Sequence, residues 1–267
     1  MTAPAELLAL AVETAREAGR LVRGRREAVT RMVVASTKST PTDVVTDSDT
    51  AAEVLIRERL LGARPGDGML GEEGGQVAGQ STVIWVVDPI DGTVNYLYGL
   101  PDYAVSIAAQ VDGRTVAGVV HNPVSGETWT AMVGEGAWLL DRRIGVSGCA
   151  QLSQALVATG FGYDARRRAR QAEVLRHVLP RVRDIRRAGS ASLDLCALGT
   201  GRLDGYYERG LAAWDLAAGG LIAQEAGAVI AGLRGRPAGP ELVVAAGPEL
   251  FPALHDLLEP LGADRDD

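Results

Sequence analysis

The spacing of hydrophobic residues divides the 267-residue chain into two halves that differ in their predicted secondary structure. In the first half, apolar residues recur at helical spacing from Leu7 to Val22, and later they alternate with polar residues in shorter runs. The Asp112-Gly113 pair suits a tight hairpin turn between two such runs. The elements predicted before residue 150 are a helix over 7–22, a helix over 49–61 ended by Gly62, a strand at 83–87, a hairpin over 103–123 and two short strands within 126–140.

After about residue 150, short strands alternate with helices, which is typical of a layered α/β arrangement. The elements predicted there are strands at 155–159, 203–208, 228–230 and 242–246, and helices at 168–179, 190–198, 214–227 and 248–258. We therefore predict an α+β first lobe, residues 1–146, and an α/β second lobe, residues 147–267. The two lobes are expected to meet across a cleft and to form one unit.

Two carboxylates stand at the end of an apolar run in the stretch WVVDPIDGTVNYLYG. Asp88 and Asp91 would repel each other and resist burial if they were unpaired, so a cation is expected beside them. Pro89 stiffens this turn, and Gly92 allows a ligand to approach the backbone closely. Thr93 stands where a helix could begin, and the free N–H groups of a helix start suit a phosphate.

Other acidic residues accompany this pair, namely Glu72 and Glu73 in a glycine-framed loop, Asp215 at the head of a helix, and Asp43, Asp47 and Asp49 in one cluster. Each also has a simpler explanation, as a helix cap or as a solvated loop charge. Together with hydroxyl and carbonyl oxygens, these carboxylates would make an oxygen-only site suited to Mg²⁺. Three widely spaced histidines offer little for zinc or for a phosphohistidine.

Composition and charge argue against a nucleic-acid-binding, a membrane and a secreted protein. The formal net charge of −7 argues against nucleic acid as the main partner. No apolar run approaches the roughly 20 residues that a membrane span needs, and charges interrupt the N-terminal segment, so neither a membrane span nor a signal peptide is expected. We expect a cytoplasmic protein. Cys149 and Cys196 indicate no disulfide framework and no zinc site. The arginine-rich segment 166–187 is explained as a solvated helix face.

Lysine is almost absent from the chain, since the 27 basic residues include a single lysine, Lys38. A coding bias toward arginine explains the arginines but not this exception. We hypothesise that position 38 requires a compact ammonium, which can approach a carboxylate as a point charge, whereas a planar guanidinium would crowd the site. The alternative is a loop charge without a role.

Three motifs occur in order: GEE at 71–73, WVVDPIDGTVNY at 85–96 and WDLAAGG at 214–220. This set resembles the signature of the inositol monophosphatase family. The blocks KSTPTDVVTDSD and RAGSASLDLCALGTGRLDGYYERG extend the resemblance over nearly the whole chain, which is most similar to inositol-1-phosphate phosphatases of the actinobacterial type. Tyr96 departs from the phenylalanine often found at its position.

The resemblance implies a layered αβαβα sandwich, a homodimer, and hydrolysis of myo-inositol 1-phosphate that depends on two or three Mg²⁺ ions and is sensitive to Li⁺. The metal ligands that it implies are Glu72, Asp88, Asp91, Asp215 and the backbone carbonyl of Ile90. The catalytic residues that it implies are Glu72 and Thr93, which would orient the attacking water, with Asp91, Lys38 and Asp49. The substrate would contact Asp91, Gly92 and Thr93 at the phosphate, and Gly189, Ser190, Ala191 and Glu208 at the alcohol.

Three alternatives stay open. Haloacid-dehalogenase-type enzymes use two aspartates in a similar motif, but those lie two residues apart, and here the spacing is three. A different substrate within the same family is a closer alternative: histidinol phosphate, fructose 1,6-bisphosphate or a 3′-phosphoadenosine nucleotide. The last alternative is an additional non-catalytic role in association with RNA polymerase or RNA, for which the segment 166–187 would serve.

Overall fold

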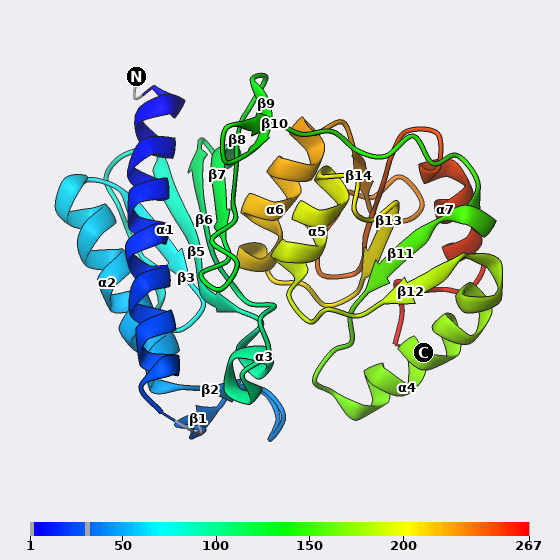
Figure 1. The fold of residues 1–267 in the computed structure, drawn as a ribbon, viewed down its shortest axis with the longest axis horizontal. Helices are drawn as coiled ribbons and strands as arrows, with labels where there is room; N and C mark the ends of the chain where they lie inside the picture. Colours follow the sequence, from blue (N-terminus) through cyan, green and yellow to red (C-terminus); the bar gives the residue numbers. More distant parts are fainter. Residues whose placement is uncertain (1–2, 30–32, 267) are drawn as a thin grey trace.

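Helices and sheets alternate in five layers in the structure, a computed structural model that describes residues 3–29 and 33–266. Two helices lie on the outer face of the larger sheet, two lie between the sheets, and two cover the outer face of the smaller sheet (Figure 1). In this order they are α1 (Pro4–Glu27) and α2 (Asp47–Ala63), α5 (Ala191–Gly199) and α6 (Ala213–Glu225), and α4 (Ala165–Val178) and α7 (Phe251–Leu258). The predicted αβαβα sandwich is confirmed.

The larger sheet has the strand order β10-β9-β8-β7-β6-β5-β3-β4. Its strands are β3 (Gly68–Gly71), β4 (Gly75–Val77), β5 (Val83–Asp91), β6 (Ala104–Val111), β7 (Arg114–His121), β8 (Thr128–Met132), β9 (Gly136–Leu139) and β10 (Arg142–Arg143). The strands from β5 to β10 form an antiparallel meander, which contains the predicted hairpin over 103–123, and β3 joins β5 in parallel. The hairpin turn has positive φ at both Asp112 (50°) and Gly113 (76°), as a tight two-residue turn requires.

The smaller sheet has the order β12-β11-β13-β15-β14. Its strands are β11 (Leu156–Thr159), β12 (Asp184–Arg186), β13 (Gly205–Glu208), β14 (Val229–Ala231) and β15 (Val243–Ala246). The remaining elements are the hairpin β1 (Ser36–Thr37) and β2 (Val44–Val45), the short helix α3 (Thr93–Tyr98) and two 3₁₀ turns, η1 (Leu152–Gln154) and η2 (Leu179–Arg181). The sequence did not predict β1, β2, β4, β10 or β12, because each has only two or three residues and little apolar alternation.

Two predicted boundaries differ from the structure. The second helix begins at Asp47 rather than Asp49 and continues through Gly62 to Ala63. Its start is fixed by a capping box, in which the side chain of Asp49 accepts a hydrogen bond from the backbone N–H of Thr46 at 2.8 Å. The strand predicted at 83–87 continues as β5 to Asp91, and this extension shapes the site described below.

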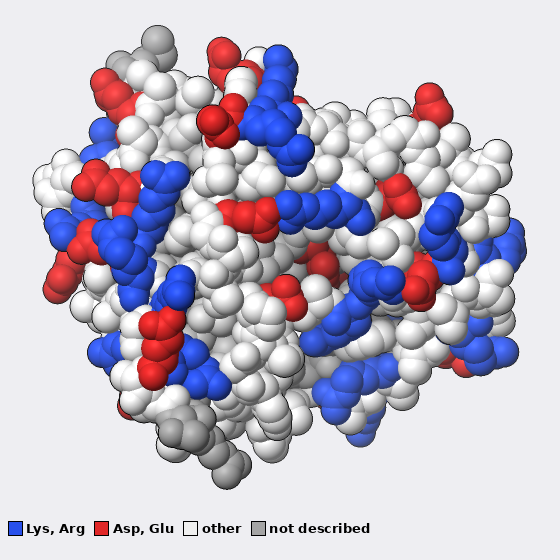
Figure 2. Space-filling view, in the orientation of Figure 1, with Lys and Arg blue, Asp and Glu red and all other residues white. Residues whose placement is uncertain are grey.

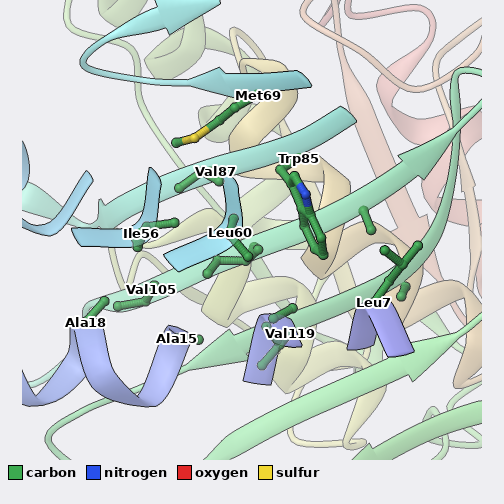
Figure 3. Packing of buried hydrophobic residues seen from close by; sticks show 14 of the residues in the cluster. Leu7, Ala15, Ala18, Ile56, Leu60, Met69, Trp85, Val87, Val105 and Val119 are labelled. Atoms are coloured by element: carbon green, nitrogen blue, oxygen red, sulfur yellow. The ribbon is translucent and has the colours of Figure 1, made fainter. Parts of the chain in front are cut away.

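The helical layers supply the core on both faces of the larger sheet. On the outer face, the packed side chains include Leu7, Ala15, Ala18, Ile56, Leu60, Met69, Trp85, Val87, Val105 and Val119 (Figure 3). On the inner face, Ala218 and Ile222 of α6 pack against Val86 and Trp129. Since α6 lies beyond residue 147 and still covers the first sheet, the predicted halves share this helical layer. The lobe boundary at 146/147 stays a prediction.

One buried histidine links the N-terminal helix to the larger sheet. His121 ends β7 and is 9% exposed, and its Nδ1 lies 3.0 Å from Thr128 Oγ1. A Cβ atom at Gly19 of α1 would stand only 2.6 Å from the imidazole, so the helix can approach the ring only because residue 19 is glycine. Burial, with a further contribution from Arg16 and Arg20, lowers the pKa of His121 from 6.5 to about 4.

Acid is therefore expected to destabilise the fold through His121. Between pH 6.5 and pH 4 the unfolded chain binds a proton at this residue and the folded chain does not, so this contribution to stability is complete above pH 6.5 and is lost as the pH falls toward 4. The expected loss in the free energy of unfolding is about 3 kcal/mol. Denaturant titrations of the wild type and His121→Gln across this range measure it. Equal pH dependence in both proteins would contradict the assignment.

Candidate active site

The end of β5 carries two carboxylates into a cleft. The pairing of β5 with β6 shifts register between Asp88 and Asp91, so that Pro89 and Ile90 form a bulge. Proline has no N–H to offer the ladder, and a bulge bends a strand and redirects its side chains. Asp88 is 1% exposed and Asp91 is 7% exposed. The DPID motif is therefore the bulged end of a buried strand.

Three carboxylates converge at this point. Asp88, Asp91 and Asp215 each offer one oxygen, and these oxygens lie within 4.8 Å of one another. The backbone N–H of Ile90 donates to Asp88 at 3.0 Å, and that of Ala212 donates to Asp215 at 2.7 Å. Asp215 thus satisfies a free N–H at the start of α6 while its carboxylate also belongs to the cluster. Asp215 therefore both caps α6 and belongs to the carboxylate cluster.

The three carboxylates lack a cationic partner among residues 3–29 and 33–266, since none of them forms an ion pair with lysine or arginine there. Burial raises the pKa of Asp88, Asp91 and Asp215 above its ordinary value, and the neighbouring carboxylates add to the effect. Removing three such charges from water is costly unless a cation compensates them. A set of carboxylate oxygens with the adjacent Ile90 carbonyl is chemically suited to a hard divalent cation. These residues therefore fit a metal site.

Two serines at the start of α5 hold Asp91 in place. Ser190 Oγ donates to Asp91 Oδ2 at 2.6 Å, and Ser192 donates to the same oxygen from its backbone N at 2.7 Å and from its hydroxyl at 2.5 Å. Ser190 was predicted to line the alcohol portion of the substrate. In the structure Ser190 is 1% exposed and its hydroxyl contacts Asp91, and its role at the alcohol stays a prediction. Ser192 was missed, although a second serine two residues along a helix start was a usable signal.

Thr93 is held by a short chain of hydrogen bonds. Its hydroxyl lies 3.1 Å from Asp49 Oδ1 and 3.0 Å from the carbonyl oxygen of Ile90. The other oxygen of Asp49 accepts from the Thr46 hydroxyl at 2.5 Å, so the carboxylate is fixed on both sides. Thr93 begins α3, as predicted, after Gly92 with φ of +93°, a conformation that favours glycine. The structure therefore brings Asp49, Thr93 and Ile90 together.

The only lysine of the chain bridges two glutamates at the cleft. Lys38 Nζ lies 2.6 Å from Glu72 Oε1 and 2.7 Å from Glu73 Oε1. Burial alone would lower the pKa of Lys38, but these glutamates outweigh that effect and raise it. Burial raises the pKa of Glu73 to about 7, and Lys38 opposes the shift. Glu53, which the sequence did not single out, accepts from the backbone N–H of Glu73 at 2.7 Å and supports this loop.

The Lys38 contact supports the hypothesis that arginine cannot replace this residue. Lys38→Arg is expected to lower kcat/KM by about tenfold or to raise the Mg²⁺ requirement, because a guanidinium is larger than the ammonium that fits between the two glutamates. The melting temperature should stay close to that of the wild type. Lys38→Gln serves as the comparison that removes the charge. Identical rates and Mg²⁺ dependence in Lys38→Arg and wild type would make the single lysine an accident.

The remaining predicted residues line the same cleft, which has a volume of about 510 Å³. Gly92, Gly189, Ala191 and Glu208 face it together with the carboxylate cluster. Tyr206 donates to Glu208 at 2.7 Å, and burial raises the pKa of Glu208 to about 7, an effect that Tyr206 opposes. Acidic side chains lie in the recess near the centre of the molecule, with basic side chains beside them (Figure 2). Phosphate-binding and alcohol-binding roles for these residues stay predictions.

The arginine-rich segment 166–187 is not one continuous helix, because it forms α4, a 3₁₀ turn and β12. Several of its guanidinium groups pair with nearby acids: Arg167 with Asp266, Arg176 with Glu173 and Arg186 with Asp184. An RNA-associated role would need these arginines to contact RNA phosphates, but in the structure they already form ion pairs within the chain.

Fold and site together define a metal-dependent phosphatase. The chain belongs to the inositol monophosphatase family, which is matched over residues 3–262. The predicted family is confirmed. Among the described residues, no helix combines the length and the apolar character needed to cross a membrane.

Individual relatives cover nearly the whole chain. The Mycobacterium tuberculosis protein named inositol-1-monophosphatase SuhB is 50% identical over 281 aligned positions, which cover 97% of each chain. A solved structure of Mycobacterium tuberculosis SuhB has a TM-score of 0.84 at 46% identity and covers 99% of this chain and 100% of its own. The extragenic suppressor protein suhB of Bartonella henselae has a TM-score of 0.90 at 36% identity, covering 95% and 98%. The Pasteurella multocida protein named Nus factor SuhB is 37% identical over 97% of this chain and 98% of its own.

Proposed function

We propose that the protein is a Mg²⁺-dependent phosphomonoester hydrolase that releases phosphate from myo-inositol 1-phosphate. The observation that carries this proposal is the convergence of three buried carboxylate oxygens within 4.8 Å in the cleft. A relative with half of its aligned residues identical bears the name inositol-1-monophosphatase, which supports the choice of substrate.

The metal site would comprise Glu72, Asp88, Asp91, Asp215 and the carbonyl oxygen of Ile90, and would hold two or three ions. When bound, Mg²⁺ lowers the pKa of a coordinated water and offsets the negative charge of the phosphate and of the departing alkoxide. The carboxylates supply the charge that retains the ions. Ser190 and Ser192 keep the Asp91 carboxylate in one orientation, so that it need not reorganise during the reaction.

The chain's other residues would position water and substrate. The Thr93 hydroxyl, which Asp49 holds at 3.1 Å, would orient the attacking water with Glu72. The backbone N–H groups of Gly92 and Thr93 would bind phosphate oxygens. Glu208 would accept hydrogen bonds from the hydroxyls of the alcohol, with its carboxyl oriented by Tyr206.

We propose direct attack by water without a phosphorylated enzyme. The carboxylates of the cleft are assigned to metal, and within the described part of the chain no histidine faces the cleft to activate a serine or cysteine nucleophile. Direct attack predicts inversion at phosphorus with a chiral thiophosphate substrate. Retention would instead indicate a covalent intermediate of the haloacid-dehalogenase type.

Substrate choice is tested by phosphate release in the presence of Mg²⁺ from four compounds: myo-inositol 1-phosphate, histidinol phosphate, fructose 1,6-bisphosphate and 3′-phosphoadenosine 5′-phosphate. The proposal expects the highest kcat/KM with myo-inositol 1-phosphate. A higher value with another compound would assign the enzyme to that substrate. We further propose inhibition by Li⁺ and by excess Ca²⁺, a homodimer and a cytoplasmic location, of which light scattering tests the dimer.

A further inference from the structure

The loop that carries Glu72 is a hairpin turn that rests on a buried glutamate of helix α2. Residues 72–74 connect β3 to β4, and Gly71 pairs with Gly75 at the base of this turn. The backbone N–H of Glu72 continues the sheet, because it donates to the carbonyl oxygen of Val87 at 3.2 Å. The next two N–H groups of the turn donate to α2 instead.

Glu53 of α2 accepts both of these N–H groups, one with each carboxylate oxygen. Oε2 accepts from the backbone N–H of Glu73 at 2.7 Å, and Oε1 accepts from that of Gly74 at 2.7 Å. Glu53 is 2% exposed, and Arg57 Nη2 also donates to its Oε1 at 2.9 Å. Hydrogen bonds to an ionised carboxylate are among the strong ones in proteins. The turn therefore cannot shift away from α2 without breaking two of them.

Two glycines of the turn leave room for this carboxylate. A Cβ atom at Gly71 would stand 2.6 Å from Glu53 Cδ, and one at Gly74 would stand 2.5 Å from Glu53 Oε1 and 2.0 Å from Arg57 Nη2. Neither glycine has a positive φ, so the backbone conformation alone does not require glycine at these positions. The glycines on either side of the two glutamates in the GEEG sequence are therefore explained by the space that Glu53 occupies.

The same face of α2 supports the second group that the proposed function uses to orient water. Asp49 lies one helical turn before Glu53, and side chains at this spacing share one face of a helix. Asp49 Oδ1 lies 3.1 Å from the hydroxyl of Thr93. One helix thus sets the position of the Thr93 hydroxyl and that of the turn which carries Glu72.

We propose that Glu53 is a positioning residue of the metal site, which fixes the turn so that Glu72 keeps one spacing from Thr93. The proposal rests on the proposed function, in which Glu72 binds metal and orients the attacking water. Glu53 acts through the backbone of the turn, since it does not itself line the cleft. If the turn were free to move, Glu72 would have to be ordered when the ions bind, which weakens their binding.

Glu53→Gln tests the proposal. The amide keeps the size of the side chain but has one acceptor oxygen, so one of the two turn N–H groups loses its acceptor. We expect the variant to bind Mg²⁺ about tenfold more weakly in calorimetry and to need about tenfold more Mg²⁺ for half-maximal phosphate release. A lower Tm in the presence of a chelator, with unchanged Mg²⁺ affinity, would show a purely structural role and overturn the proposal.

Arg57→Gln is the matched control. It removes the ion pair with Glu53 but leaves both hydrogen bonds from the turn, so the Mg²⁺ affinity should stay within about threefold of the wild type. If Arg57→Gln weakens Mg²⁺ binding as much as Glu53→Gln does, the ion pair rather than the turn would be responsible, and the proposal would fail.

Gly74→Ala changes the same contact from the side of the turn. Its Cβ atom would displace the Glu53 carboxylate, so this variant should also bind Mg²⁺ more weakly, and it decides the test if Glu53→Gln does not fold. Gly62→Ala lies in α2, where a Cβ atom would meet nothing within 4 Å, and it should bind Mg²⁺ like the wild type. Equal Mg²⁺ affinity in Gly74→Ala and Gly62→Ala would overturn the proposal.

The measurements separate this inference from the proposed function, because calorimetry reports Mg²⁺ binding whether or not phosphate is released. Weaker binding in Glu53→Gln, without phosphate release from any compound by the wild type, would contradict the proposed function and leave the positioning role standing. Phosphate release by the wild type, with equal Mg²⁺ affinity in Glu53→Gln, would overturn the positioning role alone.

Discussion

Replacing Asp91 with asparagine is expected to lower kcat/KM for phosphomonoester hydrolysis by at least about a thousandfold. Asparagine keeps the shape of the side chain but removes one charge from a cluster that must retain divalent ions. Asp215→Asn should have a comparable effect, because its carboxylate oxygen lies within the same 4.8 Å group. Steady-state phosphate release measures both variants. The double variant should lose little more than either single variant, since the carboxylates act as a unit.

Stability provides the control for these two substitutions. In the absence of divalent metal, neither variant should melt far below the wild type, because asparagine removes the repulsion between buried carboxylates and keeps most of the volume. Asp256→Asn, at a side chain that is 81% exposed, should keep full activity. A rate for Asp91→Asn or Asp215→Asn within tenfold of the wild type would mean that the metal site is misplaced.

Removal of divalent metal is expected to lower the thermal stability of the protein. A ligand that binds only the folded state at about a hundred times its dissociation constant adds about 2.7 kcal/mol. For a chain of this size, that corresponds to a rise in Tm of about 5–10 °C when Mg²⁺ is returned to the chelated protein. The shift should shrink at lower pH, because protons compete with metal for carboxylates whose pKa is raised.

The same scan with Asp215→Asn separates site binding from a general salt effect. Mg²⁺ should raise the Tm of this variant much less than that of the wild type, whereas Na⁺ at equal ionic strength should leave the two proteins alike. A Tm that Mg²⁺ raises equally in both proteins would show that the stabilising ions bind elsewhere.

The sequence predicted elements whose pattern is local and long. Helical spacing identified α1, and alternation with an Asp-Gly turn identified the β6–β7 hairpin, since both signals depend on neighbouring residues. Strand β12 was missed because it has only three residues, and its two end residues are polar and exposed, so it shows no alternation of apolar and polar residues long enough to recognise. The bulge at Pro89 and Ile90 was also missed. A proline between two acids indicated a turn, and only the pairing of β5 with β6 shows that the strand continues to Asp91.

The prediction of the candidate site depended on more than the spacing of residues along the chain. Two carboxylates near a strand end predicted a cation, but the grouping of Asp215 with Asp88 and Asp91 came from the resemblance to a known family. The contacts between α6 and β5 cannot be read from the spacing of residues in the sequence, because they depend on how the two sheets pack on one helical layer. For the same reason the hydrogen bond from Ser190 to Asp91 was not predicted, because it depends on where α5 begins.

Phosphate release from myo-inositol 1-phosphate by metal-stripped protein tests the central claim most directly. We predict no release above the chelator blank, full activity when Mg²⁺ is returned, and no recovery when Mg²⁺ is returned to Asp215→Asn. Full activity of the wild type after exhaustive chelation would contradict it.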